Sequence, residues 1–231
     1  MKVVARCHPA LRKVLPAPVP AAQMLPEWFR SMPGKTVSPT LGGETVRTLK
    51  HCPPLIDALT LGVCILLPTD LHFEGGEVFW DWNPPIISDS PISRAPIGVH
   101  VPEQAEGAPL GQSDELLLKF MNFWSLEAPE GWQLLFTHPM NRSDLPFQTL
   151  SGLVDSDRFK HGYVHFPAIL QKGFEGTIVK GTPIAQIVAV PAQEQPELLV
   201  ENMSEDWVEE SARVQRELQT DTGVYRKKYR R

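Results

Sequence analysis

The alternation of apolar and polar residues along the chain predicts many short β-strands. The continuous apolar run at 63–67 is typical of a strand that is covered on both faces. Two strands are expected at 115–124 and 131–137, joined by the turn "APEG". "GYVHFPAIL" predicts a further strand, and "EGTIVKGTPIAQIVAVP" predicts two short strands around a Lys180-Gly181 turn. The pattern therefore predicts a mostly-β domain.

Two segments have a helical pattern instead. "LPEWFRSMP" is amphipathic and predicts a single helical turn. Near the C-terminus, acidic residues come early and basic residues late, as the helix dipole prefers. A partial apolar stripe follows the same segment: Leu199, Met203, Trp207, Val214 and Leu218. We expect a C-terminal helix at about 203–219, packed on the β-domain or on a neighbour.

These elements divide the 231 residues into three segments. Residues 1–50 form a Pro-rich N-terminal segment, and residues 51–192 form the β-domain. A loose Pro-rich insertion at about 75–115 interrupts this domain, with an edge strand at "IGVHV". Residues 193–231 contain the helix and a basic tail. For a chain of this length, we expect one hydrophobic core of ordinary size.

Composition supports a globular β-protein in the cytoplasm. Twenty-three prolines argue against a helical bundle. No apolar run approaches the roughly 20 residues of a membrane helix, and the N-terminal stretch "LRKVLPAPVP" does not resemble a signal peptide. Cys7, Cys52 and Cys64 are widely spaced, which indicates neither a disulfide framework nor a zinc knuckle.

Charge argues against a general nucleic-acid binder. The net charge is −5, and five of the last six residues, "RKKYRR", are basic, so the body of the chain is more acidic still. The tail itself is expected to be solvated and frayed.

Histidine and aromatic residues suggest two alternative sites. His161 and His165 lie on one face of a strand, and with His138 they would form a cupin-like metal site if strands 132–138 and 162–169 were neighbours. An aromatic-rich zone favours core packing, with an aromatic-walled ligand cleft as the alternative. Its members are Trp80, Trp82, Phe120, Phe123, Trp124 and Trp132.

Five short motifs occur in a characteristic order: "LLPTDLHF", "PEGWQLLF", "NRSD", "GLVDSD" and "KGTPIAQIV". In this order they resemble the deoxyuridine triphosphatase (dUTPase) and dCTP deaminase superfamily. The resemblance spans about residues 57–190 without the insertion, and implies a dUTPase-like β-clip or jelly-roll barrel. The chain is also similar to uncharacterised bacterial and phage proteins that carry "CPP-x-ID" and "GTPIAQ", which implies no activity.

The dUTPase resemblance implies roles for individual residues. Asp155 would be the general base that activates water, and Arg142 with Ser143 would contact phosphate oxygens. Asp57 would assist a magnesium ion, the cofactor expected of a nucleotide hydrolase. A structural alternative stays open for each: a turn for Asp155, a surface loop for Arg142 and Ser143, and a helix or turn cap for Asp57.

The chain departs from the family pattern at its C-terminal end. The family's phosphate-covering tail is rich in glycine, whereas "TGVYRKKYRR" contains one glycine and cannot wrap a triphosphate through consecutive backbone N–H groups. We therefore expect a small-molecule-binding or assembly protein that has lost the triphosphatase chemistry. The alternatives are a magnesium-dependent hydrolase of a phosphorylated small molecule and the histidine-ligated metal enzyme. The resemblance also implies a homo-oligomer, a trimer with sites between subunits.

Overall fold

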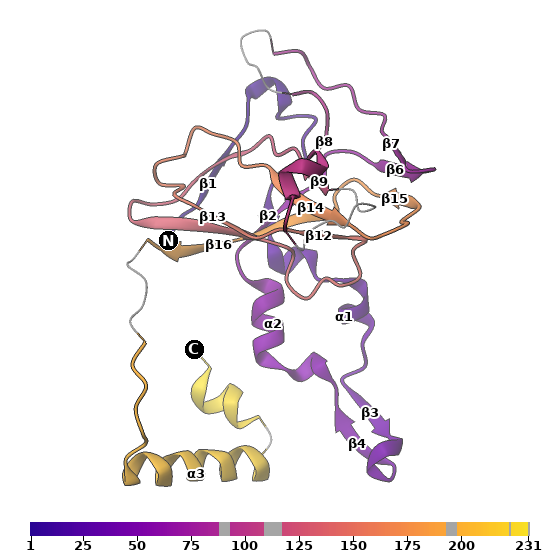
Figure 1. Ribbon diagram of the computed structural model, residues 1–231. Helices are drawn as coiled ribbons and strands as arrows, with labels where there is room; N and C mark the ends of the chain where they lie inside the picture. Colours follow the sequence, from indigo (N-terminus) through magenta and orange to yellow (C-terminus); the bar gives the residue numbers. More distant parts are fainter. Residues whose placement is uncertain (88–92, 109–116, 193–197, 222, 231) are drawn as a thin grey trace. The chain divides into compact units, whose positions relative to one another are not determined.

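The computed structural model describes residues 1–87, 93–108, 117–192, 198–221 and 223–230, and it is mostly β (Figure 1). The mostly-β prediction with one C-terminal helix is thus confirmed. The chain forms two compact units: residues 1–31 with 58–192, and residues 32–57 with 193–231. The predicted three-segment division stays a prediction. No helix within the described residues is both long and apolar enough to cross a membrane.

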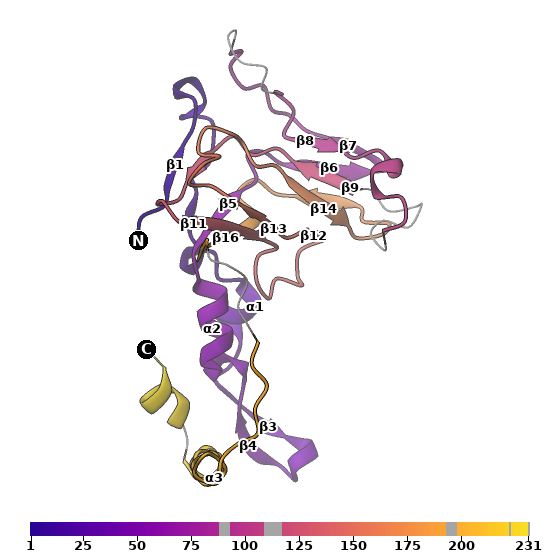
Figure 2. The same cartoon turned by 60° about the vertical axis from the view of Figure 1, so that its left-hand side comes forward.

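In the described residues of the first unit, the strands form four antiparallel sheets. The largest has the order β13 (Gly152–Val154), β11 (Trp132–Thr137), β16 (Pro183–Pro191), β5 (Val63–Leu66) and β2 (Val19–Pro20). The second has the order β12 (Phe147–Thr149), β14 (Phe166–Leu170), β9 (Leu117–Phe120) and β8 (Ile97–Val99). β15 (Gly176–Ile178), β6 (Leu71–Glu74) and β7 (Glu77–Phe79) form the third, and β1 (Val4–Arg6) pairs with β10 (Ser125–Glu127). Figure 2 shows β8, β9 and β14 in succession.

One hydrophobic core joins these sheets. Its residues come from alternate positions of the strands, as in β14, where Phe166, Ala168 and Leu170 are buried. Most of the apolar run at 63–67 lies in β5, between β16 and β2. Cys64 and Ile65, which face opposite sides of the strand, are both buried, as its pattern predicts. The rings of Phe120 and Phe147 meet edge to face, with centroids 4.9 Å apart.

Helices occupy both units. The first contains α1 (Glu27–Ser31), which matches the predicted helical turn, and α2 (Pro53–Thr60) runs across the division between the units. The second unit contains the hairpin of β3 (Lys35–Ser38) and β4 (Glu44–Arg47) and the C-terminal helix α3 (Glu205–Thr220). Short helical turns complete the fold: Pro9–Leu11, Ala21–Met24, Pro39–Leu41, Leu49–His51, Pro102–Ala105 and Tyr225–Tyr229.

Several expected elements differ from the structure. The segment predicted as a strand at 115–124 pairs as β9 at Leu117–Phe120; its first two residues lie outside the described part of the chain. Its partner across "APEG" was expected to be β11, but β10 intervenes and pairs with β1. The cause is Asn122, which is buried and binds the backbone of Trp124 and Val164, so the chain turns away from β9 there.

Candidate functional site

The main candidate site is a cavity of about 610 Å³ beside the loop between β11 and β12, which we call the Arg142 pocket. This loop and the end of β14 supply its walls. The residues lining it are His138, Asn141, Arg142, Ser143, Leu145, Pro146, Phe147, Gln148, Ile169, Leu170, Gln171 and Lys172. Arg142 and Ser143, which the resemblance assigns to ligand binding, are thus part of one cavity.

A buried glutamine in β16 fixes the start of this loop. The Oε1 atom of Gln186 accepts a hydrogen bond from Met140 N at 2.8 Å. Its Nε2 atom donates to the carbonyl oxygens of Ala58 and Leu61 at the end of α2, at 2.9 and 2.6 Å. Both N–H groups and the oxygen of a 2 % exposed amide are therefore used in linking the pocket loop to a helix end.

His138 supports the loop from within the pocket wall. Its Nδ1 atom accepts from the backbone N–H of Thr149 at 3.2 Å, which fixes the proton on Nε2. Nε2 then donates to the carbonyl oxygen of Arg142 at 3.1 Å. Burial lowers the pKa of His138, which favours this neutral form.

Arg142 is held in place by an acid next to it in the sequence. Its Nε and Nη2 atoms donate to the carboxylate of Asp144 at 2.8 and 2.9 Å, and its Nη1 atom donates to Met24 O at 3.3 Å. Trp28 Nε1 donates to the same carboxylate. Burial alone would raise the pKa of Asp144, but these hydrogen bonds and the Arg142 charge lower it.

Asp155 lies away from this pocket, in the turn after β13. Leu134 of β11 pairs with Val154, and the Asp155 carboxylate accepts from Gln133 Nε2 at 2.8 Å. Arg142 instead follows the other end of β11, beyond Thr137. At about 3.3 Å per residue, the two ends of this strand are roughly 17 Å apart. Within one chain, the structure does not bring Arg142 and Asp155 together.

The turn itself explains part of the acidic sequence at Asp155 and Asp157. The backbone carbonyl of Asp155 accepts from the N–H groups of Arg158 and Phe159, at 3.0 and 2.7 Å. The Asp157 carboxylate accepts from Gly131 N at 3.1 Å and so links this turn to the one before β11. The Asp155 carboxylate remains exposed at the edge of the sheet.

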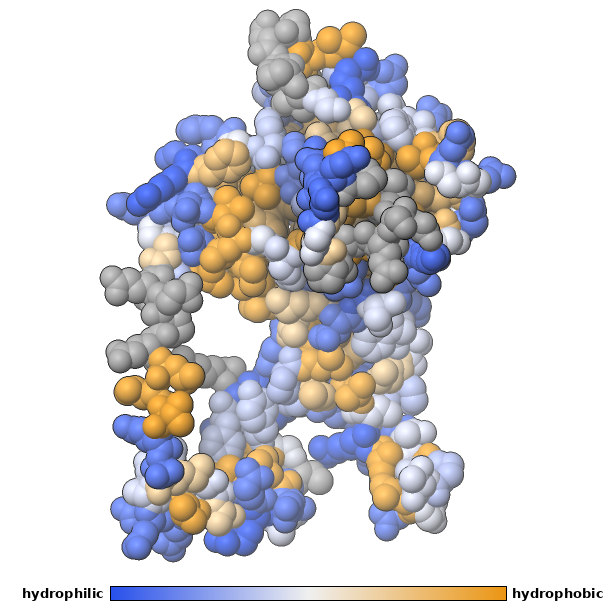
Figure 3. Space-filling view, viewed as in Figure 1, coloured by the Kyte–Doolittle hydropathy of each residue, from blue (hydrophilic) through white to orange (hydrophobic). Residues whose placement is uncertain are grey.

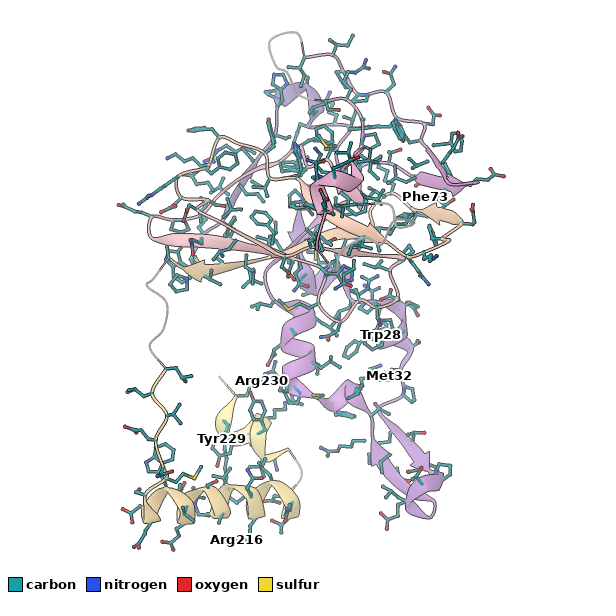
Figure 4. The ribbon with its side chains drawn as sticks, viewed as in Figure 1. Trp28, Met32, Phe73, Arg216, Tyr229 and Arg230 are labelled. Carbon is teal, nitrogen blue, oxygen red and sulfur yellow. The ribbon has the colours of Figure 1, made fainter. Side chains whose placement is uncertain are left out.

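Asp57 belongs to the second unit and lies inside α2, so the helix-cap alternative is wrong. Its carboxylate forms an ion pair with Arg230, with Nη2 and Oδ1 2.5 Å apart (Figure 4). This contact involves the C-terminal tail, which the sequence predicts to be frayed. The magnesium role of Asp57 stays a prediction.

The three histidines of the cupin-like alternative have separate surroundings. β11 and β14 belong to different sheets, so the strands that carry these residues do not pair. His165 Nδ1 accepts from Asn122 N at 3.1 Å, His138 uses both ring nitrogens, and His161 is exposed. The described ranges contain no group of three His, Cys, Asp or Glu residues that could hold a metal ion.

Most of the aromatic zone belongs to the core. Phe120, Phe123 and Trp124 are buried, and Trp82 packs edge to face on Phe123 with centroids 5.2 Å apart. Trp132 is half-buried against the same core at the start of β11, and it does not line the Arg142 pocket. Its ligand-binding role stays a prediction.

Motif reasoning did not identify three polar residues of the pocket, Gln148, Gln171 and Lys172. They lie at the paired ends of β12 and β14, where Phe147 pairs with Leu170. Gln148 lies in "PFQTLSGLVDSD", whose pattern predicts a strand and a turn. Gln171 and Lys172 follow the predicted strand "GYVHFPAIL" without any motif. Only the pairing of these two strands places them beside Arg142.

Comparison with known proteins gives matches to solved structures alone. No protein-family model and no curated protein matches the chain. A mutant dUTPase of Staphylococcus bacteriophage 80alpha with dUpNHpp is 22% identical, covering 38% of this chain and 74% of that chain, with a TM-score of 0.27. The dUTPase of phage phi11 of S. aureus is 21% identical, covering 42% and 77%, with a TM-score of 0.26. Both of these proteins are dUTPases. A likeness this partial assigns this chain no family, activity or site residue.

Proposed function

We propose that the chain binds a small phosphorylated molecule in the Arg142 pocket and does not hydrolyse it there. The observation that carries this proposal is the composition of the wall: the described residues lining the pocket include Arg142 and Ser143 but no carboxylate. A water molecule in this cavity would lack the acidic general base that hydrolysis of the dUTPase kind requires. His138 does not replace it, because both of its ring nitrogens are bound to backbone groups.

The polar groups of the pocket suit a ligand of low charge. Ser143 offers a hydroxyl group, and Gln148 and Gln171 offer amides that both donate and accept. The wall has two cations, Arg142 and Lys172, and the first shares its charge with Asp144. One phosphate fits this balance better than a triphosphate does. Leu145, Pro146 and Ile169 supply apolar surface for the rest of the ligand.

Binding measurements test this proposal directly. Deoxynucleoside monophosphates, triphosphates and inorganic phosphate are titrated into the full chain by calorimetry, with thermal shifts as a second readout. We expect a monophosphate to bind, and Ser143→Ala and Gln171→Ala each to weaken it about tenfold, the loss of one hydrogen bond to a charged group.

Gln133→Ala is the matched control, because Gln133 is also a partly exposed β-domain glutamine but lies at the far end of β11. The Gln133→Ala variant should bind the monophosphate with the same affinity as the unmodified chain. An absence of heat and thermal shift with every ligand, or equal loss in the control, would contradict the proposal.

A magnesium-dependent hydrolase with Asp155 as base is the second candidate. The exposed Asp155 carboxylate favours it, because a site between two copies could join Asp155 of one to Arg142 of the other. This composite site needs the homo-oligomer, a trimer by resemblance, which itself stays a prediction. Release of phosphate or pyrophosphate with magnesium, lost in Asp155→Asn, would replace the binding proposal with this one.

A further inference from the structure

α3 has an apolar face whose two ends, Trp207 and Leu218, are exposed, while Ser211 and Val214 between them are half-buried. The helix is 16 residues long and none of its residues is buried. Trp207 is 69 % exposed, and Leu218 is 44 % exposed. With Ser211 and Val214, they recur at the spacing of one helix face, and we call these four residues the α3 stripe. A tryptophan this exposed on a regular stripe indicates an interaction surface.

The α3 stripe is complementary to itself. When two copies of the helix run antiparallel, Trp207 of each lies opposite Leu218 of the other, and Ser211 lies opposite Val214. The large residues then meet at the two ends of about 17 Å of helix, and the smaller Ser211 and Val214 let the two helices approach at the centre. A twofold axis through the middle of the helix produces both contacts at once.

Charge along the segment favours the same arrangement. The first turns of α3 carry Glu205, Asp206, Glu209 and Glu210. The turn after the helix carries Arg226, Lys227, Lys228 and Arg230, and it lies beside the C-terminal half of α3, where Lys228 Nζ pairs with Glu217 at 2.8 Å (Figure 4). In an antiparallel pair, the acidic end of each helix meets the basic end of the other. The two helix dipoles also point in opposite directions, which is favourable.

The carboxylates that border the α3 stripe do not repel a second copy. Glu210 and Glu217 flank the stripe, and Arg213 forms ion pairs with both of them. Figure 3 shows apolar and charged side chains next to each other over α3, as expected of a narrow stripe with a charged border.

We infer that α3 docks on α3 of a second copy of this chain, as an antiparallel helix pair with twofold symmetry. The α3 stripe shares no residue with the Arg142 pocket, and the inference does not depend on the proposed function. A single pair of helices of this length buries less surface than a standard interface, so we expect a dimer in the micromolar range that dissociates on dilution.

Sedimentation velocity of the full chain over a range of concentrations tests whether the dimer forms. Trp207→Ser and Leu218→Glu should each weaken dimerisation at least about tenfold. Trp80→Ser, which removes an exposed tryptophan of the β-domain, should leave it unchanged. A chain that stays monomeric at every concentration, or that dimerises equally well in all three variants, overturns the inference.

Cysteine cross-linking tests the direction of the pair. Cys7 and Cys52, which are half-buried, are first replaced by Ser; Cys64 is buried and stays. Ser204→Cys and Asp221→Cys then mark the two ends of α3 outside the stripe. An antiparallel pair predicts disulfides when the two variants are mixed and none in either alone. Disulfides within each variant alone would mean a parallel pair and overturn the inference.

Discussion

Gly62 is a residue whose identity the backbone requires. It follows α2 with φ of +72°, a left-handed conformation that commonly ends helices at glycine. A Cβ atom at this position would lie 2.0 Å from the carbonyl oxygen of Ile187 in β16. The end of the helix therefore rests directly on the central sheet, and no side chain fits between them.

We expect Gly62→Ala to lower the free energy of unfolding by about 3 kcal/mol or more, because it adds a backbone clash to the cost of a left-handed alanine. Gly131→Ala is the control: Gly131 has φ of +74°, but a Cβ atom there would have no other atom within 4 Å. It should cost only about 1–2 kcal/mol. Urea unfolding measures both, and equal losses would show that the contact with Ile187 is unimportant.

At the residue scale, the sequence indicated where polar groups interrupt apolar segments but not what they bind. Gln186 was visible as the one amide within "PIAQIV", and Asp155 as an acid after a strand. Gln186 binds Met140 and the end of α2, and both partners are remote from it in the sequence. Such contacts depend on strand pairing, which a single chain pattern does not determine.

The turn between β9 and β10 shows how one side chain directs two elements. Asn122 Nδ2 donates to the carbonyl oxygens of Trp124 and Val164 at 2.8 and 3.1 Å, and its Oδ1 atom accepts from Trp124 N at 3.0 Å. The side chain is 1 % exposed, so these bonds have no replacement from water. The direction of β10, and with it the pairing to β1, depends on this amide.

Asn122→Asp should therefore destabilise the protein by about 3 kcal/mol near neutral pH, because an ionised carboxylate would face two carbonyl oxygens. The loss should shrink as the pH falls, since a protonated carboxyl can donate one of the two bonds. Urea midpoints at several pH values measure this. Asn141→Asp, at an exposed position, is the control and should show a much smaller loss; a loss that is independent of pH would contradict the assigned bonds.

Among the elements, those with strong local patterns were predictable. The edge strand at "IGVHV" is β8, at the edge of its sheet, and the Lys180-Gly181 turn lies between β15 and β16 with Gly181 at φ of +85°. The hairpin of β6 and β7 and the helix α2 were missed. β6 and β7 are only 4 and 3 residues long, and α2 begins with two prolines, a pair that is more typical of a turn.

The whole molecule should lose stability on acidification. Burial lowers the pKa of both His138 and His165, so the unfolded chain, with histidines near 6.5, binds more protons than the folded one. The stability from these neutral imidazoles is fully present above the unfolded pKa and is lost as the pH falls through it. Asp144, whose pKa is also lowered, adds a further loss below the unfolded value of 3.8.

Melting temperatures at about pH 7.5 and about pH 5 measure the histidine contribution. His165→Asn keeps an acceptor for Asn122 N without the titration, so the difference between the two melting temperatures should shrink. His161→Asn, at an exposed histidine, should leave the difference unchanged. An equal effect of both variants would show that burial of the imidazole is not the cause.

The bonds made by Gln186 have a consequence for any ligand of the Arg142 pocket. The same amide group touches the first residues of the pocket loop and the last carbonyl groups of α2. Occupancy that restrains the loop would also slow the opening of the helix end. Amide protons near residues 58–62 would then exchange more slowly with solvent when the cavity is filled, although none of these residues lines it.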